Sequence, residues 1–135
     1  MHYLDTNIIV YSVVNQDPGK MEISQSIIRD LFEKDELLIS PLNLQELVYT
    51  LSKLKIDMKR IKQTYFLYQR FCKNEIDKTL IDSAFKIVSR LNFGSNINDV
   101  IHLKFAEKYC TKLMTFDKDF KLLKQFSSLD IQILS

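Results

Sequence analysis

The chain opens with Met1-His2-Tyr3-Leu4-Asp5-Thr6-Asn7, and this stretch decides the fold. An apolar strand is expected over residues 2–4, and it leads through an acid directly into a helix over residues 7–14. The same order returns late in the chain, where a strand over residues 112–115 precedes a helix over residues 118–125. A short apolar strand that runs straight into a helix is typical of a parallel sheet covered on both faces.

Hydrophobic periodicity predicts the remaining elements. Further helices are expected over residues 21–33, 42–54, 58–72, 80–91 and 97–109, and further strands over residues 37–40 and 131–134. The helix over residues 80–91 is expected to turn Ile81 and Phe85 inward. Turn signals are Pro18-Gly19 and Gly94-Ser95. This alternation predicts one α/β domain over residues 1–135, a three-layer α/β/α sandwich with a short parallel sheet.

Composition limits the class of protein. The 135 residues suit one domain, and 46% hydrophobic with 27% charged residues is ordinary for a soluble globule. The net charge of +2 does not by itself indicate a nucleic-acid binder. The cysteines, Cys72 and Cys110, lack a disulfide or zinc spacing and are expected to be reduced thiols. The uncharged run over residues 6–16 is too short to span a membrane and lacks a secretory layout, so a cytoplasmic protein is expected.

Two acids directly follow predicted strands. Asp5 comes after the strand over residues 2–4, and Asp117 comes just after the strand over residues 112–115. In an open parallel sheet, ligands bind beyond the carboxyl ends of the strands, so both acids are expected to face one crevice. The alternative is that each acid only caps the helix that follows it.

Asp99 lies on the apolar stripe of its own predicted helix, in line with Leu103 and Ala106. A buried carboxylate is costly unless it is paired or binds a metal ion. The alternative is an acid favoured by the helix dipole in a capping box with Asn96, or a helix capped by Asn98. The alternative explains an acid in the first turn but not its place on the apolar stripe.

Two further acids are candidates. Glu46 lies off the leucine stripe of its helix and between Leu42 and Tyr49, so its surroundings are expected to be partly apolar. Asp119 follows Asp117 in a D-K-D-F turn, where it is a further ligand, a supporting acid or a helix cap. Each of these residues alone has an ordinary explanation as a solvent-facing acid.

The gathering of acids is the physical argument for a metal site. Two carboxylates about 4 Å apart repel by roughly 4 kcal/mol at an effective dielectric constant of about 20. Several converging acids therefore stay ionised only beside a cation, and all-oxygen ligands favour Mg²⁺ or Mn²⁺. His2 and His102 are not expected to be catalytic, since one lies within a strand and the other beside a helix stripe.

Four motifs occur in the order and spacing of a known family. They are Leu4-Asp5-Thr6-Asn7, Leu44-Gln45-Glu46-Leu47, Ile97-Asn98-Asp99-Val100 and the run from Leu113 to Phe120. With these motifs the chain resembles the PIN domain, and within it the small VapC-like toxins of type II toxin–antitoxin modules. Each motif is a modest signal, but all four in order cover essentially the whole chain. The departures are small: Val100 stands where alanine is common, and no glycine precedes the strand over residues 112–115.

The resemblance implies an α/β/α sandwich and an Mg²⁺- or Mn²⁺-dependent endoribonuclease that cleaves RNA with metal-activated water. The acidic catalytic and metal-binding residues carried over are Asp5, Glu46, Asp99 and Asp117. Asp119 is carried over as a further metal ligand, although members differ in which acid of this turn matters. Thr6 and Asn7 would be supporting polar groups. The resemblance also implies a homodimer and an inhibitory antitoxin protein.

A basic segment is the candidate substrate-binding surface. Residues 53–73 carry seven basic residues and one acid, interleaved with aromatic residues. Such a segment either attracts an RNA backbone or is a solvated helix face whose aromatic residues pack in the core or a dimer interface. The residues expected to contact RNA phosphates are Lys53, Lys59, Arg60 and Lys118.

Two other classes of protein remain as alternatives. A haloacid-dehalogenase-like phosphatase also places an Asp after its first strand, but it needs a second Asp two residues on, where this chain has Asn7. A non-catalytic PIN-like module that binds RNA or protein is the second alternative. Four retained acids argue against such a module, because a scaffold has no need of clustered charge.

Overall fold

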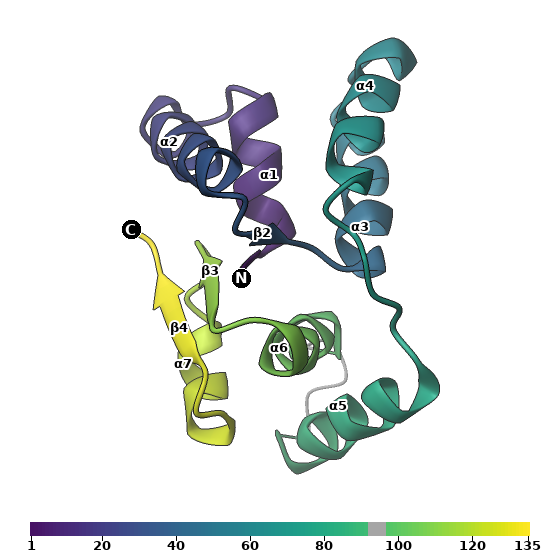
Figure 1. Ribbon diagram of the computed structural model, residues 1–135, viewed down its shortest axis with the longest axis vertical. Helices are drawn as coiled ribbons and strands as arrows, with labels where there is room; N and C mark the ends of the chain where they lie inside the picture. The colour runs from purple at the N-terminus through teal and green to yellow at the C-terminus, as the bar shows by residue number, and fades with distance from the viewer. Residues whose placement is uncertain (92–96) are drawn as a thin grey trace.

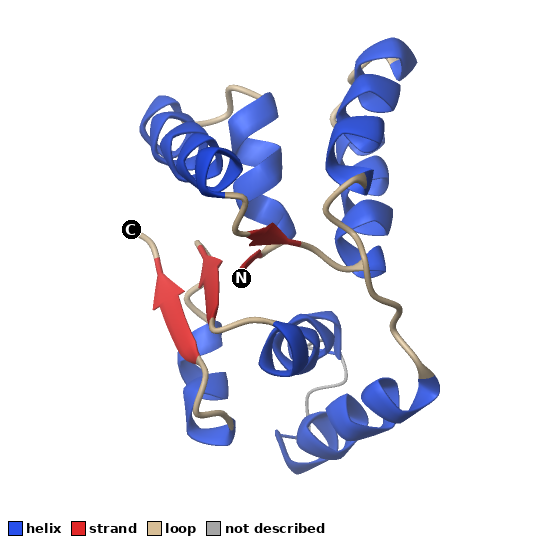
Figure 2. Cartoon of the chain, in the orientation of Figure 1, coloured by secondary structure: helices blue, strands red, loops and turns tan. Residues whose placement is uncertain are grey.

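The computed structural model describes residues 1–91 and 97–135, and it places a parallel sheet between two groups of helices (Figure 1). The described strands are β1 (His2–Leu4), β2 (Leu37–Leu38), β3 (Lys112–Thr115) and β4 (Asp130–Ile133). Their order across the sheet is β2-β1-β3-β4, and every neighbouring pair is parallel. The predicted α/β/α sandwich with a short parallel sheet is therefore confirmed (Figure 2).

Each predicted helix is present in the described residues, with ends shifted by a few positions. The helices are α1 (Thr6–Val13), α2 (Pro18–Lys34), α3 (Pro41–Lys53), α4 (Met58–Gln69), α5 (Lys78–Leu91), α6 (Ile97–Tyr109) and α7 (Phe120–Leu123). A short 3-10 helix, η2 (Lys124–Phe126), extends α7. The turn expected at Gly94-Ser95 and the cap expected at Asn96 lie outside the described residues.

Alternation along the strands divides the apolar core into two clusters. Successive strand residues point to opposite faces of a sheet. Tyr3 and Leu113 therefore pack with apolar residues of α5, α6 and α7. Their neighbours Leu4 and Met114 pack on the other face with apolar residues of α1 to α4. The sheet is buried on both faces, which explains why its strands read as short apolar runs.

Two details differ from the sequence prediction. Pro18-Gly19 is not a turn but the start of α2, because the Asp17 side chain accepts the Lys20 N–H and proline fits the first helical position. On α5, Ile81 is 42% exposed and Phe85 is 62% exposed, so the inward stripe is narrower than expected.

Among the described residues, none of the helices combines the length and apolar character needed to cross a membrane.

Candidate metal centre

Four of the predicted acids line one cleft at the carboxyl edge of the sheet. The cleft has a volume of about 680 Å³, and its walls include Asp5, Glu46, Asp99 and Asp117. Asp5 follows β1 and Asp117 follows β3, while Glu46 comes from α3 and Asp99 from the first turn of α6. The edge is where an open parallel sheet binds its ligands. The structure therefore brings together four side chains that lie far apart in the sequence.

Asp5 is held in place by β3 and by two side chains. Its backbone N–H donates to the Met114 carbonyl at 2.9 Å, and its Oδ2 accepts from the Thr115 hydroxyl at 2.7 Å and from the Asn7 amide at 3.3 Å. The Asp5 side chain makes no capping hydrogen bond to α1, so the alternative role of a helix cap is wrong for this carboxylate. Burial raises the pKa of Asp5, and the neighbouring Glu46 charge adds to the rise, against opposing contacts with His102 and Thr115.

Glu46 is bound by three donors. Its Oε1 accepts from the Thr6 hydroxyl at 2.7 Å and lies 2.6 Å from His102 Nε2, and its Oε2 accepts from the Asn98 amide at 3.2 Å. Partial burial raises the pKa of Glu46, but the hydrogen bond and charge of His102 and the other two donors outweigh it, and the net shift is downward. Glu46 therefore stays ionised and its carboxylate is held in one orientation.

Asp99 is electrostatically strained when it is ionised. Burial, followed by the charges of Asp5 and Asp117, raises the pKa of Asp99 to about 7. As predicted, it shares a helix face with Leu103 and Ala106, which are fully buried, although Asp99 itself is only half-buried. Its carboxylate needs a positive partner to remain ionised at neutral pH.

Asp117 both lines the cleft and orders its own turn. Its Oδ1 accepts the Asp119 backbone N–H at 2.9 Å, and its own backbone N–H donates to the Thr115 hydroxyl at 2.9 Å. Asp119 is exposed and is not among the residues that line the cleft. The structure therefore does not bring Asp119 to the other four acids.

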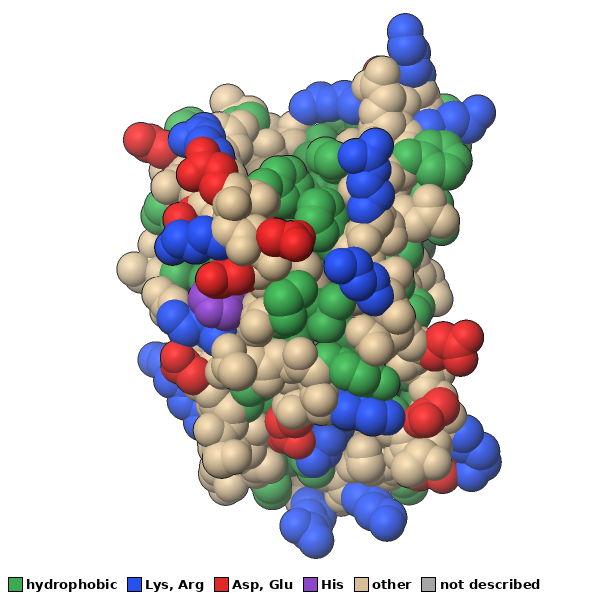
Figure 3. All heavy atoms as spheres, viewed as in Figure 1, with side chains coloured by type: hydrophobic (Ala, Val, Ile, Leu, Met, Phe, Trp, Pro, Cys, Tyr) green, Lys and Arg blue, Asp and Glu red, His purple; other side chains and the backbone are tan. Residues whose placement is uncertain are grey.

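The predicted basic residues lie outside the cleft walls. Figure 3 shows Lys and Arg side chains over α4, next to hydrophobic side chains between α2 and α4. Lys53, Lys59 and Lys118 are exposed, and the Lys53 ammonium lies 6.0 Å from the ring centre of Tyr49, which does line the cleft. The Arg60 guanidinium donates to the Val13 carbonyl at the end of α1, so this side chain already has a structural contact.

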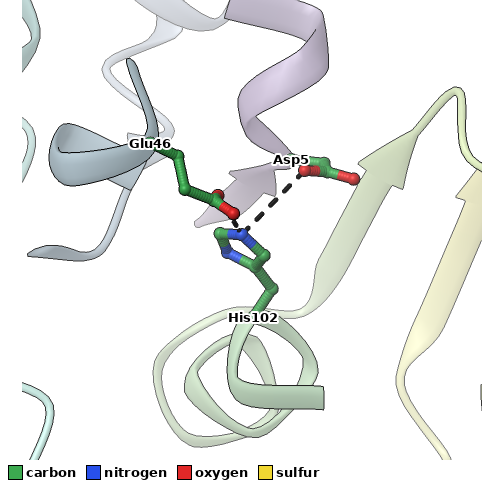
Figure 4. Close-up of side chains that lie close together, drawn as sticks. All are labelled: Asp5, Glu46 and His102. Carbon is green, nitrogen blue, oxygen red and sulfur yellow. Dashed lines mark hydrogen bonds and ion pairs between the residues drawn. The ribbon is translucent and has the colours of Figure 1, made fainter. Parts of the chain in front are cut away.

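Sequence reasoning missed two side chains of this site. His102 is 1% exposed, and its Nε2 lies close to both Glu46 and Asp5, 4.0 Å from Asp5 Oδ1 (Figure 4). Ligand atoms of these three residues all lie within 4.8 Å of one another. Thr115 is fully buried and donates to Asp5. The expectation that His102 lies beside the stripe gave it no contact with the acids. The signal available was its place one turn after Asp99 on the same helix face.

The electrostatics of the cleft fit a divalent cation. The pKa values of Asp5 and Asp99 are raised chiefly by burial, so their ionised forms are poorly solvated and the nearby His102 compensates them only in part. Among the described residues, no lysine or arginine forms an ion pair with any of the four acids. Carboxylate oxygens in this number suit Mg²⁺ or Mn²⁺, which would replace the missing positive charge.

The fold and this cleft define a class: α/β/α proteins with a carboxylate cluster at the carboxyl edge of a parallel sheet. The PIN domain family model matches residues 2–125. The chain therefore belongs to the PIN domain family, as its motifs predicted.

A solved structure has the same fold. It is a chain in the crystal structure of VapBC2 from Rickettsia felis bound to a DNA fragment from their promoter. The TM-score is 0.71, the sequence identity is 18%, and the match covers 100% of both chains. No curated protein sequence matches the chain significantly.

Proposed function

We propose that this chain is a metal-dependent endoribonuclease and the toxin of a type II toxin–antitoxin module. The observation that carries the proposal is the convergence of Asp5, Glu46, Asp99 and Asp117 on one cleft, where no lysine or arginine of the described residues pairs with them. Membership of the PIN family and the fold shared with a VapBC2 chain support it. In this proposal residues 1–135 form a single nuclease domain that acts in the cytoplasm.

The acids divide into main ligands and completing groups. A bound Mg²⁺ or Mn²⁺ would lower the pKa of the attacking water and neutralise the charge that develops on the phosphodiester. Asp5 and Asp99 would hold the ion, and Glu46 and Asp117 would complete the site. Thr115 keeps Asp5 Oδ2 occupied, which leaves Oδ1 directed at the cluster.

The RNA would lie along the cleft and be held by polar and basic side chains. Tyr49 and Gln45 line the cleft beside Glu46, and Tyr49 carries Lys53 against its ring. Lys53, Lys59 and Lys118 are free to reach phosphates from the rim because their side chains are exposed. Arg60 would contribute less to RNA binding, since its guanidinium is engaged by the end of α1.

Exposed apolar side chains support the proposal that this chain binds other proteins. The large apolar residues with the most exposed surface on α4 and α5 are Met58, Phe66 and Phe85, at 56%, 59% and 62%. Exposed apolar side chains of this size offer a surface on which another protein can pack. We therefore include an antitoxin protein and a second copy of this chain among the partners.

The proposal is tested by RNA cleavage with and without a divalent cation. The purified chain should cleave RNA with Mg²⁺ or Mn²⁺ and stop when a chelator is added, because the acids then have no ion to hold. Activity should return when excess ion is restored. Cleavage that resists the chelator would overturn the proposal, and ion binding without any cleavage would favour the non-catalytic PIN-like module.

Removal of the Thr115 hydroxyl, which supports Asp5, is expected to reduce RNA cleavage without abolishing it. Thr115→Val keeps the shape of the side chain but removes the hydroxyl that donates to Asp5 Oδ2 at 2.7 Å. Loss of such a supporting hydrogen bond should reduce cleavage by about 10- to 100-fold. Thr115→Ser keeps the hydroxyl and is the matched control, so its activity should remain within about 3-fold of the wild type. Equal activity of Val and Ser variants in steady-state assays would contradict this role.

A further inference from the structure

Glu46 belongs to a closed ring of hydrogen-bonded side chains beneath the cleft. In order around the ring, its members are Glu46, His102, Tyr3, Ser40, Asn43 and Thr6. Apart from Glu46, each member is at most 5% exposed. Figure 4 shows the point at which the ring reaches the cleft, with His102 directed at Glu46 and Asp5. Tyr3, Ser40 and Asn43 are not among the predicted site residues.

One arm of the ring runs through His102. Its Nε2 lies 2.6 Å from Glu46 Oε1, and its Nδ1 is hydrogen bonded to the Tyr3 hydroxyl. The Tyr3 hydroxyl also lies 2.9 Å from Ser40 Oγ. The two nitrogens of one imidazole are therefore both engaged, one by a cleft acid and the other by a buried chain of hydroxyls.

The other arm runs through Asn43 and Thr6. Asn43 Oδ1 accepts from the Ser40 backbone N–H at 2.8 Å and from the Ser40 hydroxyl at 3.3 Å. Asn43 Nδ2 donates to Thr6 Oγ1 and to the Leu4 carbonyl, both at 3.0 Å. Thr6 Oγ1 then donates to Glu46 Oε1 at 2.7 Å, which closes the ring.

The ring joins separate elements at the carboxyl edge of the sheet. Tyr3 belongs to β1, Thr6 begins α1, Ser40 and Asn43 form the capping box of α3, and His102 comes from α6. Both arms end on the same oxygen of Glu46, while Asn98 occupies the other oxygen. The carboxylate of this half-exposed acid is thus oriented by groups fixed in packed elements.

We propose that His102 is the positioning residue of Glu46, acting through its Nε2 and supported at its Nδ1 by Tyr3 and Ser40. The inference rests on the proposed function, since it gives Glu46 a fixed orientation toward the ion. A histidine that only filled the core would have no need to direct Nε2 at two acids of the cleft. His102 does not line the cleft wall itself, so it acts on the ion and on RNA through Glu46.

Two substitutions separate the two nitrogens. In His102→Gln the side-chain amide reaches the position of Nε2 and keeps a donor for Glu46. In His102→Asn the amide reaches only the position of Nδ1, so the contact with Tyr3 remains and the contact with Glu46 is lost. Each variant loses one hydrogen bond of the buried ring, and the melting temperatures of the two should therefore be similar.

The readouts are Mn²⁺ affinity by calorimetry and kcat and KM for an RNA oligonucleotide. His102→Asn should weaken Mn²⁺ binding and lower kcat by about 10- to 100-fold with KM for RNA unchanged. His102→Gln should stay within about 3-fold of the wild type. Tyr3→Phe removes the same contact at Nδ1 that His102→Gln lacks and keeps the Nε2 contact with Glu46, so it should lose no more activity than His102→Gln.

Each contrary result has a separate meaning. Equal losses in His102→Asn and His102→Gln, in proportion to lost thermal stability, would overturn positioning and leave only a structural role. Nitrogen coupling from His102 in the spectrum of bound Mn²⁺ would overturn positioning in favour of direct ligation. If the wild type cleaves RNA and His102→Asn is unaffected, the inference fails while the proposed function stands. A wild type that neither binds Mn²⁺ nor cleaves RNA would remove both.

Discussion

Asp5→Asn is expected to abolish RNA cleavage and at the same time to stabilise the ion-free protein. The substitution removes a main ligand of the proposed ion, and the expected loss is at least about 10³-fold in kcat/KM. The asparagine Oδ1 can still accept from the Thr115 hydroxyl, which donates to Asp5 Oδ2 at 2.7 Å. Because burial and the Glu46 charge raise the pKa of Asp5, its ionised form is unfavourable, and a neutral amide relieves that cost.

Asp5→Asn is expected to lower activity but to raise thermal stability, and this combination makes the prediction specific. RNA cleavage is measured with Mn²⁺, and thermal unfolding is measured in chelator at pH 8, where an ionised Asp5 costs most. Asp30→Asn is the matched control, because Asp30 is an exposed acid paired with Lys34 on α2. It should change neither activity nor melting temperature by much, since a surface ion pair contributes little. An active Asp5→Asn variant would contradict the proposed ligand set.

The stability of the ion-free protein is expected to fall as the pH rises from 5 to 8. The folded pKa of Asp99 is about 7, raised by burial and by the charges of Asp5 and Asp117 from an ordinary value of 3.8. A raised folded pKa gives stability that is fully present below pH 3.8 and is lost as the pH rises through about 7. With allowance for solvent screening, the loss should be about 2 kcal/mol, or roughly 6 °C in melting temperature.

Neighbouring groups do not reverse this trend. The pKa values of Asp5 and His102 are also raised in the folded protein, so both lose stability in the same direction as the pH rises. The pKa of Glu46 is lowered from 4.5, so its contribution is lost only in acid, below the window considered. Asp117 faces Asp99 as a further negative charge.

Thermal unfolding in chelator at pH 5 to 8 provides the measurement. Asp99→Asn should flatten the pH dependence, while Asp30→Asn should leave it unchanged. Mg²⁺ or Mn²⁺ should stabilise the wild type more at pH 8 than at pH 5, because protons compete with the ion for the same carboxylates. If the melting temperatures of the wild type and of Asp99→Asn change equally with pH, the raised pKa of Asp99 is not the cause of the pH dependence.

The sequence was sufficient for the strands and for the acids that follow them. Asp5 and Asp117 could be assigned to one crevice because parallel strands expose their carboxyl ends together, and this needs only the local order of strand and acid. The place of Asp99 on the buried face of its helix could be predicted from helical spacing, since the buried Leu103 and Ala106 share that face. These predictions depend on the period of one element at a time.

Contacts between elements were beyond the sequence. His102 lies on a helix buried on most sides, so periodicity could not show which residues it meets, and its partners come from β1 and α3. Thr115 looks like an ordinary strand residue until β1 and β3 are paired. Phe85 was predicted to face the core but is exposed. An apolar residue at helical spacing need not face this chain's own core.

The hydrogen bond between Thr115 and Asp5 also limits the stage of chain synthesis at which the site can form. The two residues are 110 positions apart, and β1 acquires β3 as a neighbour only once Met114 has been made. A chain still growing on a ribosome therefore carries Asp5 without its partners until β3 has been made. In the proposed nuclease, cleavage would begin only after that point in translation.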